Sequence, residues 1–152
     1  MLRNLQTNGS TFANAMNKAK VDMKRGSFVT VDNATLELKL ANGIAGAKMV
    51  NRGTKLTKEI AMGFEEDVYS DEQDIIKAGE KGYLNELEGR WATTEYDAIS
   101  ITSDTAIDSY LTIANGKLTT SGTPTIIKFI GFIQDGDHKL VGVEFDYTTK
   151  LA

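Results

Sequence analysis

From residue 27 onward, apolar and polar residues alternate along short stretches that are separated by glycine-rich turns. Alternation with a period of two puts successive side chains on opposite faces of a β-strand, whereas a helix needs apolar residues every three or four positions. The pattern predicts strands at "SFVTVD" (27–32), "TLELKL" (35–40) and "AKMVNRGTKL" (47–56), with Gly53 as a turn or bulge.

Strand signals continue through the second half of the chain. In "GFEEDVYSDEQDIIKAGEKGYLNEL" (63–87) an acidic loop precedes Ile75 and Ile76, and a glycine-flanked turn leads to a return strand. "RWATTEYDAISI" follows, and two closing strands are expected at 126–133 and 140–147, joined by a turn at 134–139. Short strands at this spacing predict a mainly β fold, with a small β-barrel or a sandwich-like body.

The stretch "DSYLTIANGKLTTSG" (108–122) is predicted to be a tight β-hairpin. Alternating residues lead into Asn115 and Gly116, and the pattern resumes at Leu118. Asn-Gly is well suited to a type I′ turn, because both central positions of that turn need a positive φ. The hairpin carries no recognisable catalytic motif, so its value is expected to be a fixed shape.

The first 26 residues differ from the rest and are expected to form an N-terminal arm (1–26) on a β-rich body (27–152). Apolar residues recur there at spacings of three and four, which is typical of a short helix that begins near residue 10 or 11 and ends at Gly26; they are Phe12, Met16, Ala19 and Met23. A helix this short and rich in asparagine is marginal in isolation. The arm, helical or extended, is expected to become ordered when it docks on a partner.

Composition limits the classes of protein that remain. At 152 residues the chain is expected to be one domain, able to bury about 70% of the surface of its unfolded form. It contains no cysteine, which excludes disulfides and thiolate-bound metals. The sequence has no apolar run long enough for a signal peptide or a membrane span, so a cytoplasm, or a particle assembled there, is the expected location.

Charge is distributed unevenly along the chain. The net charge is −4, which disfavours a nucleic-acid binder, because such proteins gather Lys and Arg on one surface. Residues 1–64 carry ten Lys or Arg against four Asp or Glu, whereas residues 65–108 carry three against thirteen. Three interpretations stay open: pairing within the molecule, head-to-tail contacts between copies, or charges on solvated loops.

The sequence contains no recognisable catalytic or metal-binding motif. His138 is the sole histidine and lies in the turn sequence "QDGDHK", and no G-x-S-x-G motif occurs. The acidic run between Glu65 and Asp74 lacks EF-hand spacing and is expected to be a solvated loop rather than a cation site. The sequence therefore predicts neither an enzyme nor a bound cofactor or metal.

Most aromatic residues are expected in the core. Trp91 is the exception, because it lies beside Arg90 in a polar stretch, and tryptophan and arginine often anchor interfaces. The arm, the charge blocks and these aromatics together give the candidate partner-binding residues: Phe12, Met16, Lys20, Arg25, Arg90, Trp91 and Tyr96.

Three segments resemble virion structural proteins of tailed bacteriophages, in particular head decoration (capsid cement) proteins. They are "IIKAGEKGYLNELEGRWATTEY", "DSYLTIANGKLTTSG" and "IIKFIGFIQDGDHKLVGVEFDY", and the resemblance covers roughly residues 70–150. Many such proteins contain a "GD.L.V...GKL" hairpin. Ile107 stands where that outline has a glycine, whereas six residues fit it: Asp108, Leu111, Ile113, Gly116, Lys117 and Leu118.

The resemblance implies a protein without catalytic activity that binds the outer surface of the expanded capsid and bridges neighbouring major capsid subunits. Its partners would be the major capsid protein and copies of itself, with no nucleic acid and no membrane, and it would reside in the virion, assembled in the host cytoplasm. Two alternatives remain open. One is a tail-tube subunit or other virion component, and the other is a carbohydrate-binding module that uses Trp91 and nearby tyrosines as a sugar platform.

Overall fold

A computed structural model describes residues 1–5, 12–13, 17–53 and 75–151 of the chain. This part of the chain forms strands, turns and loops and contains no helix, so the mainly β fold predicted from the sequence is confirmed. The strands are β1 (Leu2–Asn4), β2 (Phe12–Ala13), β3 (Met23–Lys24), β4 (Phe28–Val31), β5 (Leu38–Leu40), β6 (Lys48–Gly53), β7 (Ile75–Ile76), β8 (Gly82–Asn85), β9 (Gly89–Thr93), β10 (Tyr110–Ala114), β11 (Lys117–Thr120), β12 (Ile127–Asp135) and β13 (His138–Phe145).

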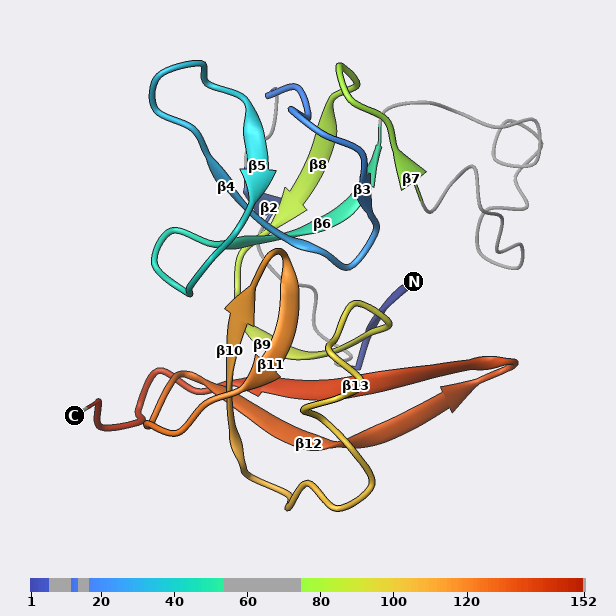
Figure 1. The fold of residues 1–152 in the computed structure, drawn as a ribbon, viewed down its shortest axis with the longest axis vertical. Coiled ribbons are helices and arrows are strands. Elements are labelled where there is room, and N and C mark those ends of the chain that lie inside the picture. The colour runs from blue at the N-terminus through green and yellow to red at the C-terminus, as the bar shows by residue number, and fades with distance from the viewer. Residues whose placement is uncertain (6–11, 14–16, 54–74, 152) are drawn as a thin grey trace.

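A six-stranded antiparallel sheet with the order β1-β9-β13-β12-β10-β11 forms the lower half of the molecule in Figure 1. Its longest strands, β12 and β13, pair from Ile127 and Phe145 up to Asp135 and His138. The register shifts between Phe129 and Gly131, which marks a β-bulge in β12.

The second sheet has the order β2-β8-β6-β4-β5 and lies in the upper half of Figure 1. Its edge strand β5 is covered by the segment 18–20, because Leu38 N donates to Lys18 O and Lys20 N donates to Leu38 O, each at 2.8 Å. The same segment reaches the chain leading into β8, where Ala19 N donates to Glu80 O at 2.8 Å. Hydrogen bonds therefore close β4, β5, β6, β8 and residues 18–20 into a small barrel. We call this barrel the ring.

Both faces of the ring strands are buried, which explains why β4 and β6 contain adjacent apolar residues. Val29 and Val50 belong to a core cluster with Ala19, Met23, Leu38, Ile76 and Leu84. Their neighbours Phe28 and Met49 belong to a different cluster that is shared with the six-stranded sheet. Because side chains alternate along a strand, one residue of each pair points into the ring and the next points toward the sheet.

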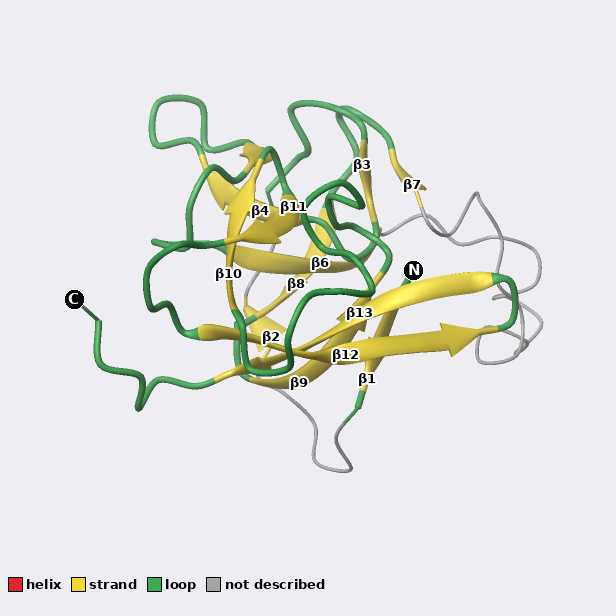
Figure 2. Ribbon diagram, turned by 60° about the horizontal axis from the view of Figure 1, so that its bottom comes forward, coloured by secondary structure: helices red, strands yellow, loops and turns green. Residues whose placement is uncertain are grey.

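The main core lies between the ring and the six-stranded sheet. Figure 2 shows the two layers, with β4, β6 and β8 above and β9, β12 and β13 below. Apolar side chains from both layers fill the space, and the cluster includes Phe28, Met49, Trp91, Leu111, Leu118, Phe129 and Val143. This packing of two β layers is the arrangement by which strands with one apolar face become stable in water.

The hairpin β10–β11 connects the two layers directly. It rises from the six-stranded sheet, and its tip meets the ring (Figure 1). Phe28 N donates to Gly116 O at 3.0 Å, and Gly116 N donates to Ala41 O at 2.9 Å. Asn115 and Gly116 have φ values of 49° and 78°, as a type I′ turn requires. The turn therefore acts as a clamp whose main chain joins two sheets.

The N-terminal residues belong to the same framework. β1 pairs with β9, and β3 pairs with β7. Leu2, Ala19 and Met23 are each at most 3% exposed. The helix expected over this stretch is wrong for the described residues, which form strands and bridges instead. Their main-chain groups pair with strands distant in sequence, which overrides the weak local helix signal.

Candidate partner-binding site

A cleft of about 480 Å³ opens where β3 and β7 face the tip of the β10–β11 hairpin. It lies beside the clamp that joins the ring to the six-stranded sheet. Its lining mixes apolar, hydroxyl, amide and charged side chains: Asp22, Met23, Lys24, Ser27, Leu40, Ile75, Lys77, Thr94, Glu95, Asn115 and Lys117. A cleft of this volume is within the range that holds small molecules or a peptide side chain with its flanking main chain.

Two polar side chains of this cleft are more than nine-tenths buried. Glu95 is 8% exposed and Ser27 is 4% exposed. The Glu95 carboxylate lies 3.3 Å from the Thr94 hydroxyl, which also accepts a hydrogen bond from the α-ammonium of Met1 at 2.8 Å. The turn after β9 holds Glu95 in place, because its main-chain N–H donates to Thr93 Oγ1 and its carbonyl accepts from Leu118 N.

The open side of the cleft carries three lysines, Lys24, Lys77 and Lys117. Asp22 lies 3.7 Å from Lys77 Nζ and also accepts a hydrogen bond from Ala78 N, so one of these three positive charges is partly balanced. The cleft therefore combines a buried carboxylate with a positively charged rim.

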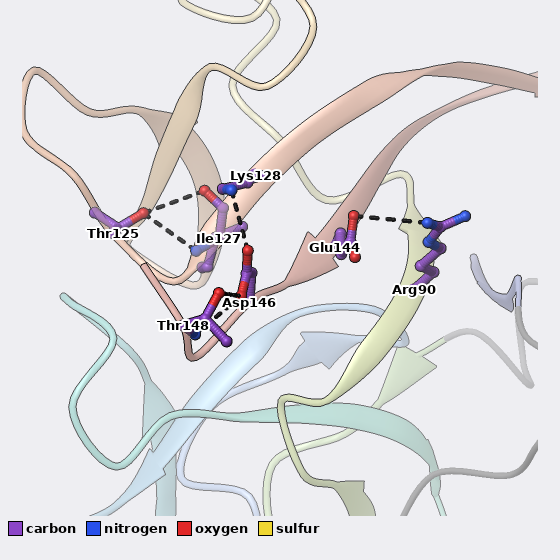
Figure 3. Close-up of polar contacts among 7 residues, drawn as sticks. All are labelled: Arg90, Thr125, Ile127, Lys128, Glu144, Asp146 and Thr148. Atoms are coloured by element: carbon purple, nitrogen blue, oxygen red, sulfur yellow. Dashed lines mark hydrogen bonds and ion pairs between the residues drawn. The ribbon is translucent and has the colours of Figure 1, made fainter. Parts of the chain in front are cut away.

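A second polar surface lies on the six-stranded sheet. Arg90 on β9 and Glu144 on β13 face each other with a 3.8 Å ion pair, and Lys128 on β12 contacts Asp146 at 3.0 Å (Figure 3). At the other end of the sheet, Arg3 contacts Asp135 at 2.6 Å. Partly exposed pairs of this kind contribute little stability but fix the pattern of charge on the surface.

Asp146 is the most strongly perturbed acid of this surface. Hydrogen bonds from the side chain and main chain of Thr148, followed by the one from Lys128, lower the pKa of Asp146 to about 2. These donors are shown in Figure 3. They stabilise the carboxylate form in the folded protein, whereas the unfolded chain has an ordinary aspartate pKa.

Replacement of Asp146 by asparagine is expected to weaken the pH dependence of stability in acid. The folded pKa lies below the unfolded one, so the contribution of Asp146 is present above about pH 4 and is lost as the pH falls toward 2. Thermal unfolding of D146N should therefore occur below that of the parent at pH 6, with the difference disappearing near pH 2. The control is D137N, in the exposed turn between β12 and β13; a D146N difference that persists unchanged to pH 2 would refute the assignment.

The structure separates the residues that the sequence suggested as partner-binding. Lys20 and Arg90 are exposed, Lys20 beside Asp32 on the ring and Arg90 on the six-stranded sheet. Trp91 is only 5% exposed, lies in the main core and donates its indole N–H to Glu88 O at 2.9 Å. The expectation of an exposed Trp91 is therefore wrong. Trp91 is also too buried to stack on a sugar, as the carbohydrate-binding alternative requires.

The remaining predicted residues are less well placed for contact or are not described. Tyr96 is half-buried and packs edge-on against Phe132, with ring centres 6.0 Å apart. Arg25 is half-buried in the turn before Gly26. Phe12 lies in β2, but its side chain, Met16 and the acidic run between Glu65 and Asp74 lie outside the described residues.

Sequence reasoning did not single out Glu95 or Ser27. Each stands in an ordinary strand or turn sequence, and only the packing of three separate segments around the cleft makes them neighbours of one cavity. The unequal charge blocks did indicate one kind of contact within the molecule. Lys48 of the basic block contacts Glu86 of the acidic block at 2.8 Å.

The described residues contain no group of three or more His, Asp or Glu side chains that could hold a metal ion. The same residues contain no helix with the length and hydropathy to cross a bilayer. No protein-family model, curated protein sequence or solved structure matches this chain.

Proposed function

We propose that the protein is a non-enzymatic structural component of a tailed-bacteriophage virion that binds the outer capsid surface and stabilises the lattice of the major capsid protein. It would be assembled in the host cytoplasm and reside on the capsid. The sequence resemblance in the hairpin and the flanking strands supports this proposal, and the geometry of the same hairpin adds to it.

The observation that carries the proposal is the position of the β10–β11 hairpin. The segment with the resemblance is also the clamp whose turn bonds the ring to the six-stranded sheet through Phe28 and Ala41. A cement protein must hold two neighbouring subunits at a fixed separation. Two β layers joined by a shared core and a main-chain clamp provide such a rigid spacer.

Stabilisation of a capsid by such a protein follows from mass action. A protein that binds the assembled lattice and not its dissociated subunits stabilises the lattice by RT ln(1 + [L]/Kd) for each site, about 2.7 kcal/mol when its concentration is 100 times Kd. Many copies on one shell multiply this effect. High affinity at each site is therefore not needed.

Among the candidate contact residues, Arg90 is the best placed. Its side chain is exposed on the outer side of the six-stranded sheet, in the row of charges shown in Figure 3. Lys20 is exposed on the ring, where it contacts Asp32 at 3.4 Å. We assign the capsid-facing surface to the sheet that carries Arg90.

Purified protein is expected to sediment in stoichiometric amounts with expanded shells that lack it, and to raise the temperature at which those shells dissociate. R90E should weaken binding by about tenfold, since an unfavourable interfacial charge costs on the order of 1–2 kcal/mol. K150E, in the exposed C-terminal segment, is the matched charge-reversal control.

Two results would contradict the proposal. Failure of the parent protein to bind the shells or to alter their thermal stability would exclude a decoration role. Rings or tubes formed by the protein alone would indicate a tail-tube subunit instead.

A further inference from the structure

We propose that the cleft beside the hairpin clamp receives a basic side chain from an extended segment of a partner protein, with Glu95 as its acceptor. This goes beyond the proposed capsid role, because it concerns the chemistry of one cavity and does not depend on which partner supplies the segment. Three observations support it.

The first observation is that the Glu95 carboxylate has few hydrogen-bond and ion-pair partners within the protein. The residue is 8% exposed, and no lysine or arginine nitrogen of the described residues forms an ion pair with its carboxylate within 4.0 Å. Its one side-chain hydrogen bond comes from the Thr94 hydroxyl, at 3.3 Å. That hydroxyl has a single proton and also lies 3.4 Å from Met1 O, so the two acceptors compete for it.

A buried carboxylate in this situation is costly. Taking a charge out of water is compensated when the group is paired and hydrogen-bonded, and a charge without a partner destabilises the fold. The α-ammonium of Met1 bonds to Thr94 Oγ1, so that hydroxyl stands between the ammonium and Glu95. The carboxylate therefore has acceptor capacity left on the side that faces the cleft.

The second observation is Ser27. Its hydroxyl lines the same cleft, the residue is 4% exposed, and the hydroxyl has no hydrogen bond to any other described residue. Its main-chain groups are used, with Ser27 N donating to Lys24 O and Ser27 O accepting from Val50 N. A buried hydroxyl with free capacity, in the same cleft as a buried carboxylate, gives two acceptors for the N–H groups of one cation.

The third observation is the positive rim, which restricts the kind of occupant. Lys24 and Lys117 repel a free cation, whereas the main-chain carbonyls beside a lysine or arginine of a peptide can accept hydrogen bonds from these two ammonium groups. An extended peptide has such oxygens on either side of a lysine or arginine. A bare divalent ion fits poorly, because Ca²⁺ takes six to eight oxygen ligands and Glu95 is the only nearly buried carboxylate among the described lining residues.

The test is an NMR titration of the full-length protein with two blocked tripeptides, acetyl-Ser-Lys-Ser-amide and its uncharged norleucine counterpart. The lysine peptide should shift the amide signals of Thr94 and Glu95 saturably, and the norleucine peptide should bind about tenfold more weakly, as expected for loss of a charge-assisted hydrogen bond. E95Q should reduce lysine-peptide affinity by a similar factor and S27A by less, whereas the control E37Q should leave it unchanged.

Thermal stability provides a second readout that does not involve the peptide. If Glu95 is incompletely satisfied in the free protein, E95Q should unfold at the same temperature as the parent or at a higher one, because an incompletely compensated buried charge has been removed. The proposal is overturned if E95Q is clearly less stable, since Glu95 would then be satisfied internally. It is also overturned if neither peptide binds, or if the lysine and norleucine peptides bind equally.

Discussion

Replacement of Gly116 by alanine is expected to lower the free energy of unfolding by about 2–4 kcal/mol. Gly116 has a φ of +78°, which L side chains rarely adopt. A Cβ there would lie 2.7 Å from Leu40 Cδ2 and 3.3 Å from both Leu40 Cβ and Phe28 O. The Leu40 side chain and the turn would have to move apart, which weakens the bonds from Phe28 N and to Ala41 O.

Chemical denaturation of G116A measures this loss, and G136A is its matched control. Gly136 also has a positive φ, +60°, but a Cβ there meets nothing within 4 Å. G136A should therefore show the conformational cost alone, about 1 kcal/mol. Equal losses in the two variants would mean that the hairpin does not clamp the ring against the six-stranded sheet.

Removal of residues 1–25 is expected to abolish folding of the remaining chain. The variant loses β1, β3, the cover of β5 and the buried side chains of Met1, Leu2, Ala19 and Met23. Burying one large apolar side chain contributes about 1.5–3 kcal/mol, so the loss of Met1, Leu2 and Met23 alone is about 4.5–9 kcal/mol. That approaches the whole stability of a typical domain, about 5–15 kcal/mol.

The NMR spectrum and the thermal unfolding of residues 26–152 test this directly. We expect poorly dispersed amide signals and no cooperative transition. The control is V21S in the full-length protein, because Val21 is 44% exposed in the same segment and its loss should leave folding intact. A well-dispersed spectrum for residues 26–152 would instead support a separate arm docked on an independent body.

The strands were predictable from local pattern where a polar residue follows each apolar one. β10 and β11 lie where the alternation and the Asn-Gly turn place them. The expected turn at 134–139 is shorter in the structure, since β12 continues to Asp135 and β13 begins at His138. The main chain of polar residues at the end of a long hairpin forms the same interstrand hydrogen bonds as that of apolar residues. A search for alternating apolar residues does not detect this part of a strand.

The expected start of β5 was too early for a different reason. Residues 35–37 belong to the turn between β4 and β5, where Leu36 has a φ of 58° and its N–H donates to Asp32 O at 2.7 Å. A leucine at such a position breaks the usual preference for glycine or asparagine. Asp32 and Asn33 favour a turn, but no propensity rule would extend it to a positive φ at Leu36.

The candidate site was much less predictable than the fold. A polar neighbourhood suggested an exposed Trp91, but in a two-layer fold the face of β9 that carries Trp91 points into the main core. Glu95 looks like one of many surface carboxylates in the sequence, and it is buried because the hairpin tip, β3 and the turn after β9 meet around it. Such positions depend on contacts between distant segments, which local spacing does not encode.

The pairing of β1 with β9 has a consequence for the order in which the chain can fold during synthesis. Leu2 is made about ninety residues before its partner Thr93, and Ala19 is made about sixty residues before Glu80, to whose carbonyl it donates. The early segments cannot pair until the ribosome has completed the middle of the chain, and pairings between distant residues form slowly. The nascent N-terminal region therefore carries unpaired apolar residues until β9 has been made, which makes this stage the one most exposed to misfolding and to chaperone binding.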